Sequence, residues 1–299
     1  MHARRSKVNW LLGLSLVLVL AVAVVAFALP RSGRATTGWK EIWSDQFNGP
    51  VGSPVNTQKW EYQVGHGIFG NGEVEVMTDS TSNVHLDGHG HLDITAIHQG
   101  NQWTSGRIKS LQAFTPEPGR EVRVVASLRL PAVAQGLGYW PAFWMLGVGT
   151  WPAHGEIDIM EDVNSLSQHS GTLHCGNLTQ LNGDGTYGPC HETNGLTSRL
   201  RPCPGCVAGY HVYSVTIDRR HAGNEQIRWY LDGQEFFHVN ERQVGAAAWD
   251  LAAHHSFNII FDLAMGGSFP DLKCTCATPT ATTTSGGTLQ VAYVAVYQN

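Results

Sequence analysis

Acidic residues alternate with isoleucines in the segment 155–162, which reads GEIDIMED. Alternation of this kind predicts a strand with one apolar and one polar face. Glu156 and Asp158 then share the polar face, whereas Glu161, five residues after Glu156, points the other way in a regular strand. The three acids come to one face only if the strand holds one extra residue, so we predict a β-bulge near Met160.

The spacing of the two glutamates fits a defined chemistry. With the bulge, Glu156 and Glu161 are four effective strand steps apart, so their backbones are separated by about 13 Å. Side chains that lean inward bring the carboxyls toward the roughly 5 to 5.5 Å separation of retaining glycosidases. Burial and neighbouring negative charge raise the pKa of one carboxyl, which then stays protonated as a general acid.

Two other interpretations of the acidic segment are weaker. A solvated strand face normally pairs its acids with Lys or Arg, and none lies between Arg129 and Arg199. A calcium loop of the EF-hand type requires a glycine and spaced oxygen ligands that this segment lacks. A strand also spreads its carboxylates along a line.

Aromatic residues precede the acids, namely Trp140, Phe143, Trp144 and Trp151. Core packing is the ordinary role of any single tryptophan, because this side chain is heavily buried on average. Sugars present C–H faces that stack on indole rings. Several tryptophans beside a carboxylate cluster therefore indicate a carbohydrate site.

The rest of the chain predicts a β-rich domain. From Trp39 onward, short apolar or alternating runs are bounded by turn dipeptides such as Asp87-Gly88 and Asp232-Gly233. The clearest of these runs are 122–130, 210–217, 227–231, 257–263 and 289–297. Residues 246–253 form the best helical candidate, and the Thr-, Ser- and Gly-rich stretch 278–287 is expected to be a loop. Many short strands with little helix predict an all-β sandwich or barrel.

The N-terminus has the pattern of an export signal. Arg4, Arg5 and Lys7 precede a largely apolar run over residues 11–29. Residues 1–35 are therefore expected to be a cleaved signal peptide or an uncleaved signal anchor, and both place the domain of residues 36–299 outside the cytoplasm. The formal net charge is -5, and no Lys/Arg run follows the N-terminus, so nucleic acid is not an expected partner. We expect a monomer.

Six cysteines are an even number in an exported chain, which favours disulfides. Cys203-Pro-Gly-Cys206 has the spacing of half a zinc site or a redox pair, but no second closely spaced Cys/His pair completes four ligands. A loop staple is the preferred interpretation. Cys274 and Cys276 are too close for a comfortable mutual bridge, so we expect them to pair with the earlier cluster, which also includes Cys175 and Cys190.

GEIDIME resembles the active-site signature of glycoside hydrolase family 16, in its bulged, laminarinase-like branch. The resemblance covers nearly all of the chain after residue 39. Its further motifs are FGNGE at 69–73, WTSGR at 103–107, WPAFW at 140–144, TLH at 172–174, WYLDG at 229–233 and the segment 258–270 with AMGG.

The resemblance implies a β-jelly-roll of two curved antiparallel sheets whose concave face is an open cleft for polysaccharide. By the same resemblance, Glu156 is the nucleophile and Glu161 the acid/base. Asp158 tunes this pair, and His174 lies close to Glu161. As a lone histidine, His174 is equally a satisfied core residue.

Further residues are implied as sugar-binding. These are Asn71, Glu73, Arg107, Trp140 and Trp144, to which Trp151 is added for its place beside the acids. A structural ion pair is the alternative for Arg107, and a turn position is the alternative for Asn71.

The chain departs from the family pattern at three positions. The acid that helps some members hold a structural Ca²⁺ is replaced by Ala292, and the resemblance implies no other cofactor. Phe69 and Phe269 stand where tryptophan is common.

The expected substrate is a β-1,3-glucan or a mixed-linkage glucan. Hydrolysis or transglycosylation of a galactan or another cell-wall polysaccharide is the alternative, since the altered aromatics and the cysteine-bearing insertion leave the polymer open. A non-catalytic glucan-binding protein on the same fold is a third possibility. Retention of two mutually repelling glutamates speaks against it.

Overall fold

The computed structural model describes residues 38–67 and 70–299. The expected export segment and Phe69 lie outside these residues. Within the described ranges, no helix has the length and apolar character needed to cross a membrane.

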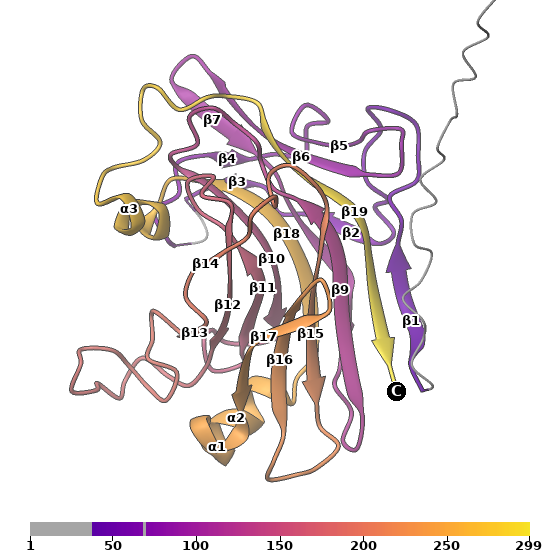
Figure 1. The fold of residues 1–299 in the computed structure, drawn as a ribbon, viewed down its shortest axis with the longest axis vertical. Coiled ribbons are helices and arrows are strands. Elements are labelled where there is room, and N and C mark those ends of the chain that lie inside the picture. Colours follow the sequence, from indigo (N-terminus) through magenta and orange to yellow (C-terminus); the bar gives the residue numbers. More distant parts are fainter. Residues whose placement is uncertain (1–37, 68–69) are drawn as a thin grey trace, which may run out of the picture. The chain divides into compact units, whose positions relative to one another are not determined.

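Two β-sheets form the domain, and their strands curve together through its length (Figure 1). The first sheet has the order β17-β16-β15-β9-β19-β6-β7-β4-β3, with β1 paired to β19 and β5 to β6. Its strands are β1 (Lys40–Asp45), β3 (Gly65–His66), β4 (Val76–Met77), β5 (Val84–Leu86), β6 (Leu92–Gln99), β7 (Gln102–Ser105), β9 (Glu121–Arg129), β15 (His211–Asp218), β16 (Gln226–Leu231), β17 (Gln234–Asn240) and β19 (Gly287–Gln298).

The second sheet has the order β13-β12-β11-β10-β18-β8-β2, with β14 paired to β12. Its strands are β2 (Trp60–Tyr62), β8 (Arg107–Phe114), β10 (Tyr139–Gly147), β11 (Glu156–Glu161), β12 (Gln168–His174), β13 (Leu196–Thr197), β14 (Arg201–Pro202) and β18 (Phe257–Met265). Pairing between the described strands is antiparallel except between β4 and β7. The architecture is the expected β-jelly-roll sandwich.

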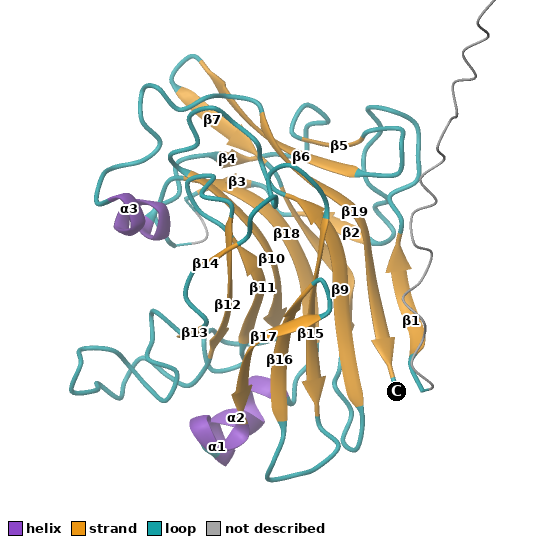
Figure 2. Cartoon of the chain, in the orientation of Figure 1, coloured by secondary structure: helices purple, strands orange, loops and turns teal. Residues whose placement is uncertain are grey.

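Helices are short and lie at the ends of strands (Figure 2). They are α1 (Glu241–Val244), α2 (Ala246–Ala253) and α3 (Ser268–Cys274). The helix expected at 246–253 is confirmed as α2. The loop expected at 278–287 is confirmed too, since β19 begins at its last residue.

Alternation along β10 separates the two faces of the second sheet. Tyr139, Phe143 and Met145 belong to the main core between the sheets. Trp144 instead belongs to a small separate apolar cluster with Ile260 on the other face. Side chains an even number of residues from Trp144 along the strand share that outer face. Trp140, four residues earlier, is one of them, so the acids of the neighbouring β11 have an aromatic surface beside them.

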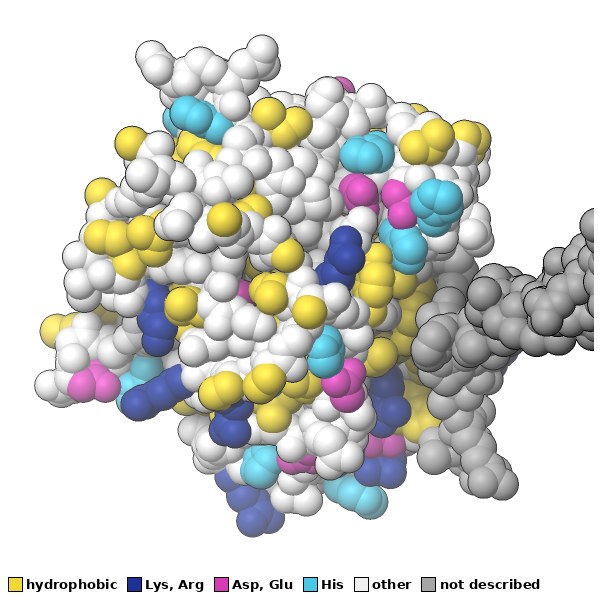
Figure 3. Space-filling model, turned by 45° about the horizontal axis from the view of Figure 1, so that its top comes forward, with side chains coloured by type: hydrophobic (Ala, Val, Ile, Leu, Met, Phe, Trp, Pro, Cys, Tyr) yellow, Lys and Arg dark blue, Asp and Glu magenta, His cyan; other side chains and the backbone are white. Residues whose placement is uncertain are grey.

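Charged side chains are sparse on the face of the molecule shown in Figure 3. Lys, Arg, Asp and Glu are scattered over the face shown in Figure 3 and do not gather into a patch of one sign. This distribution agrees with the 14% of charged residues in the sequence.

Candidate active site

The predicted β-bulge is present in β11, beside β10. Asp158 pairs with Trp144 and Met160 pairs with Phe143, so the register leaves Ile159 without a partner in β10. Ile159 and Met160 are adjacent in sequence, yet both are fully buried in the main core. Two consecutive inward side chains mark the extra residue of a bulge.

The same irregularity appears on the β12 side. Asp158 pairs with Thr172 and Glu161 with Ser170, so three steps along β11 match two steps along β12. The shift turns Glu161 to the outer face, where Trp140 Nε1 donates a hydrogen bond of 2.9 Å to its Oε1. The expected juxtaposition of the acids on one face is thus confirmed.

A tryptophan from the opposite sheet contacts the backbone of the bulge. Trp229 lies in β16 and is fully buried, and its Nε1 donates to the carbonyl oxygen of Asp158 at 2.7 Å. Gly171 makes room for this ring, because a Cβ there would lie 2.5 Å from Trp229 Cδ1. The Asp158 carbonyl is therefore directed into the core at the bulge.

His174 links the acids at the start of β11. Its Nε2 lies 3.8 Å from Glu156 Oε1 and 3.4 Å from Asp158 Oδ2. On the other side of the ring, Nδ1 lies 2.7 Å from Glu192 Oε2. His174 thus contacts acids on both ring nitrogens.

Burial and mutual charge perturb this cluster strongly. Burial first, and then the negative charge of Asp158, raise the pKa of Glu156 and of Glu161 to about 8. Burial acting alone would lower the pKa of His174, but its contact with Asp158 and its hydrogen bond to Glu192 outweigh burial and raise this pKa well above 6.5. The cluster therefore contains an imidazolium among carboxyls that hold protons unusually tightly.

Arg107 and Trp144 lie next to each other near the acidic cluster. The guanidinium carbon of Arg107 lies 4.6 Å from the centroid of the Trp144 ring, and Nε donates to Gln63 Oε1 at 2.7 Å. Trp144 Nε1 in turn donates to Asp262 Oδ1 at 2.7 Å. Arg107 is 7% exposed. Burial lowers the pKa of Arg107, while the charges of Asp262 and Glu156 oppose this effect and favour its protonated form.

The other expected sugar-binding residues are Asn71, Glu73 and Trp151. The backbone and side-chain nitrogens of Asn71 donate to the carboxylate of Glu73, both at 3.1 Å, so Asn71 occupies a turn in this state. Glu73 forms a backbone bridge with Gly266 just beyond β18. Trp151 is 40% exposed, with its ring centroid 5.8 Å from that of His174.

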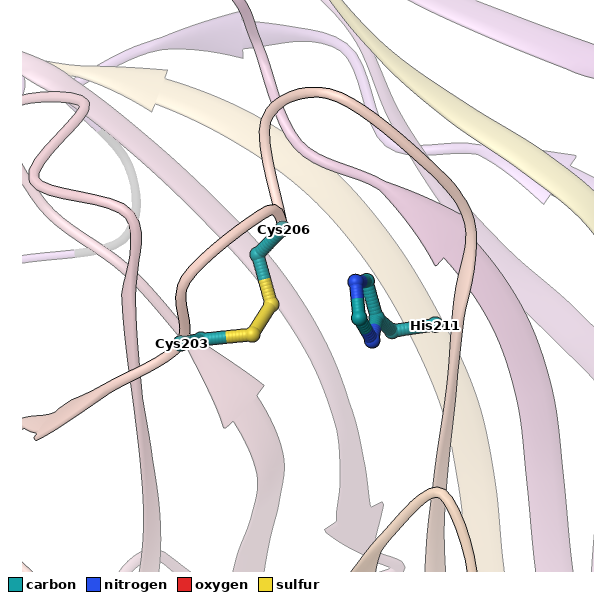
Figure 4. Close-up of side chains that lie close together, drawn as sticks. All are labelled: Cys203, Cys206 and His211. Atoms are coloured by element: carbon teal, nitrogen blue, oxygen red, sulfur yellow. A yellow bond between two sulfur atoms is a disulfide. The ribbon is translucent and has the colours of Figure 1, made fainter.

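The cysteines form three disulfides: Cys175–Cys190, Cys203–Cys206 and Cys274–Cys276. The second confirms the loop staple, beside which the ring of His211 lies (Figure 4). His211 Nδ1 contacts Asp232 Oδ2 at 2.7 Å. Bonded to each other, the two sulfurs are not thiolate ligands for a metal.

The expected pairing of Cys274 and Cys276 with the earlier cysteines is wrong. These two residues pair with each other, and their Cα atoms lie 5.2 Å apart. Thr275 between them caps α3 in the left-handed conformation, with φ 55° and ψ 39°. This local turn brings the two Cα atoms into the range of an ordinary disulfide.

Residues that the sequence analysis did not identify complete the surroundings of the acids. They are Gln63, Trp229, Glu192 and Asp262. Asp262 carries a readable signal, since it is an acid within the apolar run 257–263. Glu192 can be recognised from the sequence only when the Cys175–Cys190 pairing is known, because that disulfide brings residues 190–192 back to the strand of His174.

Comparisons with known proteins agree with this geometry. Residues 74–199 match the family model described as XgeA-like, catalytic GH16 domain. The chain is 33% identical over 291 residues to glucan endo-1,3-beta-glucosidase A1 of Niallia circulans, covering 88% of this chain and 38% of that protein. It is 32% identical over 248 residues to the beta-glucanase of Rhodothermus marinus, covering 77% of each.

Among solved structures, the endo-1,3-beta-glucanase from Streptomyces sioyaensis matches with a TM-score of 0.81 and 40% identity, covering 90% of this chain and 99% of that chain. The chain spans well under half of the Niallia protein but most of the Rhodothermus protein. With the signature residues assembled on one face of a bulged strand, this chain belongs to glycoside hydrolase family 16.

Proposed function

We propose that this chain is a retaining endo-β-1,3-glucanase, in which Glu156 is the nucleophile and Glu161 the acid/base. The observation that carries the proposal is the bulge in β11, which brings both glutamates to one face in unlike surroundings. A retaining glycosidase requires two carboxyl groups close together on one face of the site.

The surroundings support the division of roles. The cations His174 and Arg107 both lower the pKa of Glu156 against the effect of burial, which favours the ionised form that a nucleophile requires. Glu161 instead accepts a hydrogen bond from the neutral indole of Trp140. Burial and the negative charge of Asp158 raise the pKa of both glutamates to about 8, so the pair holds on to a proton near neutral pH. We assign the first ionisation to Glu156, beside the two cations, and the retained proton to Glu161, as a general acid requires.

The reaction then proceeds in two displacements. Glu156 attacks the anomeric carbon and forms a glycosyl ester while Glu161 gives its proton to the departing glycosidic oxygen. Glu161, now ionised, takes a proton from water, and the resulting hydroxide displaces Glu156 with net retention. These steps use carboxyls and water, so the chemistry requires no cofactor.

The position of the site supports endo-cleavage. β11 is an inner strand, with β12 on one side and β10 followed by β18 on the other. A polymer that crosses the outer face can therefore contact the sheet on both sides of the acids. Trp140 and Trp144 on one side and the exposed Trp151 on the other offer stacking surfaces for sugar rings.

The substrate is proposed from the relatives. The Niallia and Streptomyces proteins are named for action on 1,3-β-glucan, and their similarity covers most of this chain. The three disulfides favour an oxidising environment outside the cytoplasm. We therefore place the enzyme outside the cell, where it meets cell-wall or storage glucans.

Incubation of the protein with laminarin, mixed-linkage β-glucan and a galactan tests the proposal. We expect internal cleavage of laminarin, seen as a ladder of oligosaccharides, with the β-anomer appearing first in proton NMR spectra. Cleavage of the galactan alone would reject the substrate, and no cleavage of any polymer would reject the enzyme.

A variant tests the nucleophile. Glu156→Gln should abolish cleavage while urea denaturation stays close to that of the wild type. Glu41→Gln, at a glutamate in β1 on the other sheet, is the matched control and should keep full activity. Unchanged activity of Glu156→Gln would contradict the assignment.

A further inference from the structure

The cysteine-bearing insertion, residues 175–206, contacts His174 beside the acids of β11. It lies between β12 and β15, where long loops and the short strands β13 and β14 border the eight-stranded sheet (Figure 1). The contact is made by Glu192, whose side chain is fully buried. A buried carboxylate is costly unless it is paired and hydrogen-bonded.

Both carboxylate oxygens of Glu192 have specific partners. Oε2 lies 2.7 Å from His174 Nδ1, and Oε1 accepts a 2.8 Å bond from the backbone nitrogen of Cys175. The backbone of Glu192 exchanges two hydrogen bonds with Tyr187, at 2.7 and 2.8 Å. The Cys175–Cys190 disulfide closes the loop two residues before Glu192. The Glu192 carboxylate is thus held from several directions at the Nδ1 edge of the imidazole.

We propose that Glu192 is a positioning residue for catalysis: it fixes the orientation of His174 and keeps its ring protonated, so that the disulfide-closed insertion takes part in the catalytic machinery. The inference rests on the proposed function. Glu192 acts through His174 and does not touch the reacting atoms.

The geometry gives the imidazolium a defined task. With Nδ1–H bonded to Glu192, the second N–H of the ring is directed toward Asp158 and Glu156, at 3.4 and 3.8 Å. Two other charged groups belong to this cluster. His174 lowers the pKa of Glu161, and Arg107 lowers the pKa of Glu156. If His174 were neutral, the carboxyls of Glu156, Asp158 and Glu161 would lose one of the positive charges that offset their mutual repulsion.

The variant Glu192→Gln removes the charge at nearly constant volume. The amide oxygen can still accept from the Cys175 nitrogen, and the NH₂ group then faces His174 Nδ1. An NH₂ donor favours the form of the ring that has no proton on Nδ1. The substitution therefore favours the neutral histidine through both charge and hydrogen bonding.

Titration of the His174 ring nitrogens by NMR gives the first readout, with the resonance assigned from its loss in His174→Gln. We expect the His174 midpoint in Glu192→Gln to fall by about one pH unit or more. In the same variant, the alkaline limb of the pH profile of kcat/KM on laminarin, which follows deprotonation of Glu161, should move to higher pH, because a neutral His174 no longer lowers the pKa of Glu161.

Glu225→Gln is the matched control. Glu225 is also buried, and its Oε2 lies 2.6 Å from His254 Nε2 in a pair away from the acids of β11. This variant should leave the His174 midpoint and the alkaline limb in place. Lower activity of Glu192→Gln at every pH, with no movement of the limb, would reduce Glu192 to a structural role and overturn the proposal.

The wild-type titration is a second test that needs no variant at Glu192. A His174 that titrates at the ordinary value for histidine overturns the proposal directly. Failure of the proposed function is distinguishable, because an inactive wild-type protein still reports through NMR whether Glu192 holds the proton on His174.

Discussion

Trp229→Phe tests whether the catalytic bulge depends on a hydrogen bond that crosses the core. Trp229 Nε1 donates to the Asp158 carbonyl at 2.7 Å from the opposite sheet. Phenylalanine keeps most of the apolar ring but has no N–H. The buried carbonyl then lacks this donor, and the backbone at the bulge is free to relax toward a regular strand, which would turn Glu161 away from Glu156.

The magnitude follows from two contributions. Loss of the donor to a buried carbonyl costs about 1–3 kcal/mol, and the smaller ring leaves a cavity worth about 1 kcal/mol. We expect the free energy of unfolding, measured by urea denaturation, to fall by about 2–4 kcal/mol. A displacement of the glutamates by about 1 Å lowers kcat by up to about a hundredfold, measured on laminarin.

Trp249→Phe separates stability from catalysis. Trp249 is also fully buried, but its single indole donor binds Glu225 Oε2 at 2.9 Å and not the backbone of the bulge. This variant should lose comparable stability and keep its kcat. If kcat falls equally in both variants, or in neither, the link between the cross-core bond and the bulge is refuted.

Three further changes have defined outcomes. Burial raises the pKa of Glu75 from 4.5 to about 8, so native stability falls as pH rises through this window; by pH 7 the loss spans about 2.5 pH units at about 1.36 kcal/mol each, or about 3 kcal/mol. Glu75→Gln, which keeps an acceptor for the Met265 nitrogen, should reduce the slope between pH 5 and pH 7 in urea denaturation by the Glu75 share and leave the share of Glu156 and Glu161. An unchanged slope would contradict the raised pKa of Glu75. Combined Cys175→Ser and Cys190→Ser opens a loop with a separation of 15 residues and should lower the free energy of unfolding by about 3 kcal/mol; a change below about 1 kcal/mol would show that the loop is held by other contacts. The Trp151 side chain is 40% exposed, so Trp151→Ala should change the free energy of unfolding by less than about 0.5 kcal/mol. The same variant should raise KM about fivefold, because about 1 kcal/mol of stacking on the sugar is lost. An unaltered KM would show that Trp151 does not bind the substrate.

The bulged strand is predictable from sequence because its signal is local. Ile157 and Ile159 establish the period, and a third acid five residues after the first breaks it, so the extra residue must lie between them. The longer strands are predictable for the same reason. Strands of two residues, such as β3, β4, β13 and β14, are too short to show a period, and they form because neighbouring loops bring the backbones together.

The parts of the site that escaped prediction depend on how the chain closes on itself. Six cysteines allow 15 pairings, and the position of Glu192 follows from one of them. Cys175 comes directly after His174, so its bridge to Cys190 returns the chain to the histidine and places a carboxylate two residues beyond the bridge against Nδ1. The path of the chain also explains the wrong prediction for Cys274 and Cys276. The left-handed conformation of Thr275 allows these two residues to pair with each other, although their spacing in the sequence disfavours it. The charge balance around Glu156 and Glu161 is therefore a property of disulfide connectivity as much as of the acidic strand, and replacing a cysteine in the insertion should be read first as a change in the electrostatics of the catalytic cluster.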